Sequence, residues 1–239
     1  MQNGVFQTGN PRWSAVFSLF MGVMALIAAE FIPVSLLTPI ARDLAVTEGM
    51  AGQTVTAVGV FAVLTSLLLA PLTGNIDRRR ILLAFSAMLA ASYMLIGIAP
   101  TYPIMLIGRA ILGICVGGFW SLASAVTLQL VPTKDVPRAL SIVYAGVSVA
   151  TIIALPVASW IGHLIGWRNV FSLGALMAAF GFVWQYRALP SLPARAGSGF
   201  RDMSALLRRT WVLAGIGGNI LSFGGYHIFF TYLRPFLEL

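Results

Sequence analysis

The stretch that most constrains the fold of this chain is residues 14–38, SAVFSLFMGVMALIAAEFIPVSLLT. It carries one charged side chain, Glu30, in a run of 25 residues. Roughly 20 apolar residues are enough for a helix to cross the core of a bilayer, so this run is long enough to span a membrane. A carboxylate at the bilayer centre costs roughly 2.5 kcal/mol or more, and Glu30 is therefore a candidate functional residue.

Similar apolar runs recur along the whole chain. We predict seven membrane-spanning helices, at residues 14–38, 51–73, 81–99, 104–130, 139–161, 169–187 and 211–233. Charged residues make up only 9% of the chain, against about 25% in a typical soluble domain. Membrane β-strands need only about 9–11 residues of alternating polarity, and these runs are longer and apolar on every side. The predicted fold class is all-α, a polytopic membrane helical bundle.

The basic residues indicate the orientation of the chain in the membrane. With a cytoplasmic N-terminus, eleven of the 15 Lys and Arg residues fall in inner segments and three in outer segments, and Arg109 lies within the fourth span. This positive-inside bias favours that topology. The net charge of +8 therefore reports on topology, and no nucleic-acid partner is expected. The first ten residues are polar and the first span is too long for a signal peptide, so we expect it to stay in the protein.

The spans group into three regions. We predict a six-helix bundle over residues 1–187, a basic cytoplasmic linker over 188–210, and a seventh helix over 211–239 that begins an incomplete second bundle. Stripes of small residues on the fourth and fifth spans allow helices to approach closely in lipid. These stripes include Gly113 and Gly117 on the fourth span and Gly146 on the fifth, and we interpret them as packing surfaces.

Four local motifs resemble those of the major facilitator superfamily, in its drug and metabolite:proton antiporter branch. They are Gly74 to Arg80 (GNIDRRR) after the second span, Arg109-x-x-x-Gly113-x-x-x-Gly117 in the fourth, Ala154 to Ser159 (ALPVAS) in the fifth, and Trp167-Arg168-x-x-Phe171 at the start of the sixth. Each motif is short, but their order and spacing across six spans match the family.

Within this family, several segments are similar to those of bacterial purine nucleoside efflux pumps. They include residues 11–18, 30–39, 117–120, 165–171 and 229–235. The resemblance implies a proton-coupled antiporter that exports purine nucleosides or similar small metabolites across the bacterial inner membrane. Family members have twelve helices, so the resemblance also implies that this chain is truncated and inactive alone, and that it needs a second copy or the missing C-terminal half.

Glu30 and Arg109 are the candidate proton-coupling residues. Glu30 lies eight residues from the outer end of its span and Arg109 five residues from the outer end of the fourth. These offsets correspond to about 12 Å and 8 Å at ~1.5 Å per residue, so the two side chains lie at similar depth. An arginine nearby would keep Glu30 ionised until its contact weakens and the carboxyl takes a proton. The alternative is a purely structural ion pair.

The resemblance assigns a cytoplasmic gate to Asp77, Arg78, Arg79 and Arg80, with Asp77 facing the positive start of a neighbouring helix. The alternative is that the three arginines only anchor the topology. Pro156 belongs to the helix that carries the antiporter motif in this family.

The candidate substrate-binding residues are aromatic and hydrogen-bonding side chains within the spans. Phe119 and Trp120 can stack on a purine, and stacking on bases contributes roughly 1–3 kcal/mol, although membrane aromatics also serve as core or lipid-facing residues. Candidates for hydrogen bonds to ribose or base are Gln53, Ser121, Asn219, Tyr226 and His227. Ser and Thr also bond back to their own helices, which is the alternative for Ser121.

No catalytic motif is found: the sequence has no Gly-rich nucleotide loop, no paired His with metal spacing, and no nucleophile–His–carboxylate set within reach. We therefore expect no enzyme activity, no cofactor and no metal. Two alternatives to nucleoside export remain: efflux of sugars or drugs by the same fold, and a non-transporting half-unit that pairs with another transporter chain. An intramembrane enzyme built on Glu30 and His163 is disfavoured, because the topology separates them by nearly a whole helix.

Overall fold

A computed structural model describes residues 11–74, 76–193 and 208–237. The chain divides into two compact units, Met1–Arg195 and Ala196–Leu239. The elements of the first unit are α1 (Trp13–Ser35), α2 (Leu37–Asp43), α3 (Glu48–Thr73), α4 (Arg78–Gly97), α5 (Tyr102–Leu130), η1 (Thr133–Asp135), α6 (Val136–Val149), η2 (Ala150–Ala154), α7 (Leu155–Ile165) and α8 (Trp167–Ala188). The second unit contains α10 (Thr210–Leu237).

All secondary structure within the described ranges is helical, which confirms the predicted fold class. In the part of the chain that the structure describes, five helical segments are long and apolar enough to cross a membrane: Trp13–Ser35, Glu48–Thr73, Arg78–Gly97, Tyr102–Leu130 and Thr133–Ile165. The other two predicted spans coincide with α8 and α10. Part of the predicted linker, residues 194–207, lies outside the described residues.

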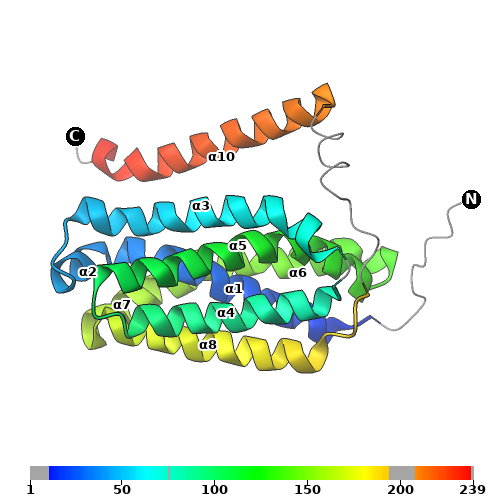
Figure 1. The fold of residues 1–239 in the computed structure, drawn as a ribbon, viewed down its shortest axis with the longest axis horizontal. Coiled ribbons are helices and arrows are strands. Elements are labelled where there is room, and N and C mark those ends of the chain that lie inside the picture. Colours follow the sequence, from blue (N-terminus) through cyan, green and yellow to red (C-terminus); the bar gives the residue numbers. More distant parts are fainter. Residues whose placement is uncertain (1–10, 75, 194–207, 238–239) are drawn as a thin grey trace, which may run out of the picture. The chain divides into compact units, whose positions relative to one another are not determined.

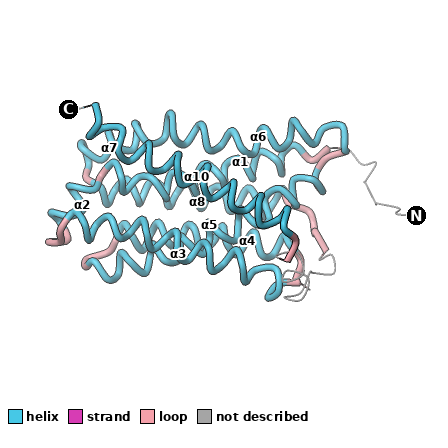
Figure 2. The backbone as a smooth tube through the Cα atoms, turned by 90° about the horizontal axis from the view of Figure 1, so that it is seen from above, coloured by secondary structure: helices cyan, strands magenta, loops and turns pink. Residues whose placement is uncertain are grey.

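The long helices of the first unit run side by side along a common direction (Figures 1 and 2). The helix α1 is central and packs against α5, α6, α8 and, less extensively, α3 and α7. The pairs α3–α5, α4–α8 and α4–α5 form the other large contacts. Large apolar side chains such as Leu72, Ile152 and Trp160 remain exposed on the outside of the bundle, as expected for surfaces that meet lipid tails.

Helix boundaries follow local sequence signals. Thr47 caps α3 by accepting a hydrogen bond from the Met50 N–H at 3.2 Å, and Asp77 caps α4 by accepting one from the Arg79 N–H at 2.8 Å. A single residue, Gly166, joins α7 to α8 with φ +86°, a conformation that favours glycine.

Two prolines interrupt the spans that contain them. Pro33 lies in the last turn of α1, which ends at Ser35 rather than running on to residue 38 as predicted. Pro156 follows the π-helical segment η2, so the fifth span is a single helical path with a wide turn in its middle. Proline has no N–H for the bond to residue i−4, and a π turn is a common local adjustment at such a place.

The small-residue stripes pack against helix backbones. A Cβ on Gly113 would lie 2.5 Å from the carbonyl oxygen of Val58 in α3, and a Cβ on Gly117 would collide with the backbone of Ala62. A Cβ on Gly146 of α6 would lie 2.8 Å from a carbonyl oxygen of α1. These contacts confirm the packing interpretation of the stripes.

Candidate functional site

Arg109 is buried at the meeting point of α1, α3 and α5. Its side chain has no exposed surface. The guanidinium donates from Nη1 to the Ala29 carbonyl at 2.7 Å, from Nη2 to the Glu30 carbonyl at 3.0 Å, and from Nε to the Thr54 carbonyl at 3.1 Å. The buried charge is thus surrounded by carbonyl dipoles from two neighbouring helices, which offset part of the cost of burying it.

The sequence analysis placed Glu30 and Arg109 at similar depth, and the structure brings them together. The Glu30 side chain is partly buried, and its negative charge interacts electrostatically with the Arg109 guanidinium. The hydrogen bond from Arg109 to Glu30 is to the backbone carbonyl. Arg109 therefore holds the main chain at the residue that carries the candidate proton site.

An aromatic stack connects α5 to α6. The rings of Trp120 and Tyr144 lie nearly parallel, with an interplanar angle of 10° and centroids 5.6 Å apart. The Tyr144 hydroxyl shares a hydrogen bond with the Ser124 hydroxyl at 2.7 Å. Trp120 is partly buried and Tyr144 is 40% exposed, so the stack presents a flat aromatic and hydroxyl-bearing surface at the edge of the bundle.

Trp120 follows Arg109 by eleven residues on α5, which is about 16 Å along the axis at ~1.5 Å per residue. The stack and the Glu30–Arg109 pair are therefore separate places on one helix. Sequence reasoning selected Trp120 but missed Tyr144, because only the register of α6 against α5 shows that these side chains meet.

Phe119 lies in the core rather than beside Trp120. It is 2% exposed, and its ring packs against Gly22 of α1. The same region contains a buried polar network that sequence reasoning also missed. The Ser86 hydroxyl donates to Gln185 Oε1 at 2.6 Å, and Gln185 Nε2 donates to the Ser18 carbonyl at 3.2 Å. This network joins α1, α4 and α8 through a fully buried glutamine.

Two of the predicted hydrogen-bonding residues have local partners. Ser121 is exposed, and its hydroxyl donates to the Gly117 carbonyl of its own helix at 2.7 Å. Gln53 is exposed, and its Oε1 accepts a hydrogen bond from the Tyr102 hydroxyl at 3.2 Å. Both residues keep exposed surface beside these contacts.

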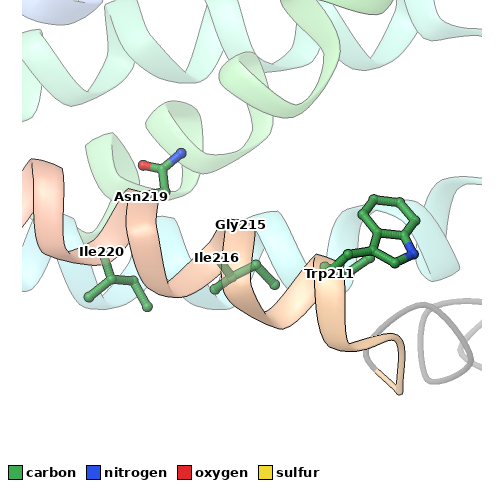
Figure 3. A pocket seen from close by; sticks show the side chains of 6 residues that line it. Trp211, Gly215, Ile216, Asn219 and Ile220 are labelled. Atoms are coloured by element: carbon green, nitrogen blue, oxygen red, sulfur yellow. The ribbon is translucent and has the colours of Figure 1, made fainter.

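The remaining predicted substrate residues belong to the second unit. Asn219 is exposed on α10, while the side chains of Tyr226 and His227 lie outside the described residues. Figure 3 shows Asn219 on a different side of α10 from Ile216 and Ile220. A hollow of about 590 Å³ on this helix is lined by Trp211, Val212, Gly215, Ile216, Asn219 and Ile220. A hollow walled by one helix alone does not enclose a ligand, so it carries no assignment.

Asp77 gathers hydrogen bonds from two parts of the chain. Besides the Arg79 N–H, its carboxylate accepts from the Ser191 hydroxyl at 2.6 Å and from the Leu192 N–H at 3.0 Å. Burial alone would raise the pKa of this carboxyl, but these hydrogen bonds and the charge of Arg80 hold the pKa of Asp77 below its usual value. We call Asp77, Arg79, Ser191 and Leu192 the Asp77 cluster.

The three arginines of the predicted gate differ in their surroundings. The Arg79 guanidinium donates to the Tyr186 carbonyl at 2.7 Å and lies 5.4 Å above the ring of that tyrosine. Arg78 is partly buried and Arg80 is exposed. Among the described residues, the Asp77 carboxylate thus contacts the start of its own helix, α4, and the segment after α8.

The opposite end of the bundle contains an ion pair between Asp43, after the first span, and Arg168, at the start of α8. The Trp167 indole N–H also donates to Asp43 at 3.0 Å, and Arg168 donates to the Ala99 carbonyl at 2.9 Å. The Trp167–Arg168 motif therefore links the start of α8 to the ends of α2 and α4. The Pro156 of the antiporter motif is exposed on α7.

Comparison with known proteins defines the family. The model of the Major Facilitator Superfamily matches residues 15–239. The chain is 44% identical over 225 residues to the purine ribonucleoside efflux pump NepI of Salmonella paratyphi B, with 94% of this chain and 57% of the relative covered. The NepI protein of Salmonella typhimurium gives the same values. The chain thus spans little more than half the length of the curated relatives it matches.

Solved structures give the same fold. A peptide transporter POT matches with a TM-score of 0.68 at 16% identity, covering 94% of this chain and 49% of that one. An inward-facing bacterial homologue of the human lysosomal transporter Spinster matches with a TM-score of 0.67 at 15% identity, covering 77% and 44%. The motifs, the helical bundle and these matches agree: the chain belongs to the Major Facilitator Superfamily.

Proposed function

We propose that this chain forms the first part of a proton-coupled antiporter that exports purine nucleosides across the bacterial inner membrane, with its N-terminus in the cytoplasm. The observation that carries the proposal is the 44% identity to purine ribonucleoside efflux pumps across 94% of the chain. Because the chain covers 57% of those pumps, activity is expected from a complete twelve-helix form or from an assembly with a second half or a second copy.

The aromatic stack supports a flat, polar substrate. A purine can extend the Trp120–Tyr144 stack, and stacking on a base contributes roughly 1–3 kcal/mol. Hydroxyl groups of Ser121 and Ser124 on the same helix are suited to the ribose. Aromatic rings also stack on the C–H faces of sugars, so the preference for a nucleoside over sugar efflux by this fold rests on the identity to the purine ribonucleoside efflux pumps.

Glu30 is the proposed proton carrier. It is the carboxylate within the first span, it is partly buried, and it lies within the electrostatic reach of Arg109. Buried carboxylates in membrane spans are costly and mark proton paths. Since the stack lies about 16 Å from Arg109 along α5, the proton and the base occupy separate places, and exchange is linked through movement of the helices.

Binding of inosine, a purine ribonucleoside, separates these two roles. The sample is the purified chain, and the same chain completed with the C-terminal part of a relative, measured by isothermal titration. Trp120→Ala is expected to weaken inosine binding about five- to hundredfold with its pH dependence unchanged. The control is Trp160→Ala, at an α7 tryptophan that is 66% exposed. Glu30→Gln is expected to retain binding and lose the pH dependence.

Equal loss of binding in the Trp120 and Trp160 variants would refute the stack as the base site. Inosine binding with an unchanged pH response in Glu30→Gln would refute Glu30 as the proton carrier. Binding of a hexose in place of inosine would favour the sugar alternative, and binding without any transport in the completed form would favour a non-transporting half-unit.

A further inference from the structure

The proline in α1 leaves a backbone carbonyl without its usual partner. In a regular helix the N–H of residue 33 would donate to the carbonyl of residue 29. Pro33 has no N–H, and its ring crowds the carbonyl of residue i−4. Ala29 is only 1% exposed, so bulk water does not reach this carbonyl. In a membrane span such a carbonyl must find a partner inside the protein.

Arg109 supplies that partner. The shortest of its three hydrogen bonds, from Nη1 at 2.7 Å, is to the Ala29 carbonyl. Its Nη2 donates to the next carbonyl, that of Glu30, at 3.0 Å, while Nε donates to Thr54 of α3. One planar guanidinium thus takes over the bond that Pro33 cannot make and fixes the peptide on either side of the Glu30 Cα to a neighbouring helix.

We propose that Arg109 is a positioning residue that replaces the hydrogen bond missing at Pro33 and thereby sets the placement of Glu30. This proposal rests on the proposed role of Glu30 as the proton carrier. It assigns Arg109 a task that depends on the geometry of its fork and not on its charge alone. A lysine at this position would carry the charge but would not make three divergent bonds from a planar group.

The consequence is an energetic coupling between two positions 76 residues apart in the sequence. Substituting Pro33 by alanine restores the donor for the Ala29 carbonyl, so Arg109 becomes less important in that background. We therefore expect Arg109→Lys to lower the midpoint of thermal unfolding by several degrees, and Pro33→Ala to reverse about 2–4 °C of that loss, as one recovered buried hydrogen bond predicts for a chain of this size.

A double-mutant cycle tests this directly, using the whole chain in detergent with the four combinations of Pro33→Ala and Arg109→Lys. The matched control pairs Arg109→Lys with Pro71→Ala. Pro71 is also a proline inside a membrane helix, α3, but its i−4 residue, Leu67, is not among those Arg109 bonds. We expect the unfolding midpoint lost in Arg109→Lys to recover when Pro33→Ala is added and not when Pro71→Ala is added. Equal recovery from both prolines, or from neither, would overturn the proposal.

The placement of Glu30 has its own readout, the infrared carbonyl band of its protonated carboxyl, identified by its loss in Glu30→Gln. Arg109→Lys is expected to shift this band more with Pro33 present than in the Pro33→Ala background. A band unmoved by Arg109→Lys would overturn the positioning role. Neither readout depends on transport, so the positioning role fails or survives separately from nucleoside export, which the inosine measurements test.

Discussion

Removal of the Asp77 carboxylate is expected to loosen both the start of α4 and the segment that follows α8. In the Asp77→Ala variant, the Arg79 N–H loses its cap, and the Ser191 hydroxyl and Leu192 N–H lose their acceptor. Loss of an N-cap costs about 0.5–2 kcal/mol, and each hydrogen bond to a neutral donor contributes about 1 kcal/mol when partly exposed. The cap and the two hydrogen bonds together give an expected loss of about 2.5–4 kcal/mol.

The assay is thermal unfolding of the chain in detergent at pH 7. A loss of about 2.5–4 kcal/mol corresponds to a midpoint lower by about 5–16 °C for a chain of 150–250 residues. Asp77→Asn is the matched control, because asparagine is also a good N-cap; it is expected to lose less than half as much. Ser191→Ala removes a single donor, so its loss of stability is expected to be smaller than that of either Asp77 variant.

The pH dependence of this effect follows from the lowered pKa of Asp77. A carboxylate whose pKa is lower in the folded state stabilises that state above its unfolded pKa, near 3.9, and loses this contribution as the pH falls through the folded value. The difference between the wild type and Asp77→Ala is therefore expected to be constant from pH 7 to about pH 5 and to shrink below pH 4. A difference that grows on acidification, or no change in midpoint at pH 7, would refute the reasoning.

Three further substitutions test the packing and polar contacts of the bundle. Gly113→Ala is expected to lower the free energy of unfolding by about 1–3 kcal/mol, because its Cβ would meet an α3 carbonyl at 2.5 Å. Gly59→Ala, with open space around the new Cβ, is expected to be neutral or stabilising by up to about 1 kcal/mol. Both variants are measured by thermal unfolding. Ser86→Ala is expected to cost about 1–3 kcal/mol by removing the donor to the buried Gln185 Oε1, and a double variant with Gln185→Leu should recover part of that loss. Asp43→Asn is expected to cost at most about 1 kcal/mol, because its side chain is 44% exposed and that of its arginine partner 36% exposed; an effect that does not weaken with added salt would contradict this.

The sequence was sufficient for the helical fold and for the meeting of Glu30 with Arg109. A long apolar run that crosses a bilayer must form a helix or part of a closed barrel. The rise per residue of a helix then converts sequence offsets into depth in the membrane. That depth argument cannot show which atoms meet. Whether Arg109 contacts the carboxylate of Glu30 or the backbone carbonyls near Pro33 depends on how α1 and α5 are rotated, which no single-helix pattern specifies.

Contacts between segments far apart in the chain also could not be predicted from the sequence. The stack of Trp120 on Tyr144 depends on the register of α6 against α5, and the bond from Ser191 to Asp77 joins residues 114 positions apart. Serine and tyrosine are common in membrane helices in many roles, so neither residue type gave a signal. Gln185 was the strongest missed clue, since an amide within an apolar span requires a partner.

Transport of labelled inosine tests the central claim most directly. Inverted membrane vesicles with an imposed proton gradient would carry the chain alone, the chain completed with the C-terminal part of a relative, or the completed form with Glu30→Gln. The account predicts gradient-driven inosine uptake by the completed form and its loss with Glu30→Gln. No inosine uptake by the completed form, with correct membrane insertion demonstrated, would contradict the assignment of a purine nucleoside exporter.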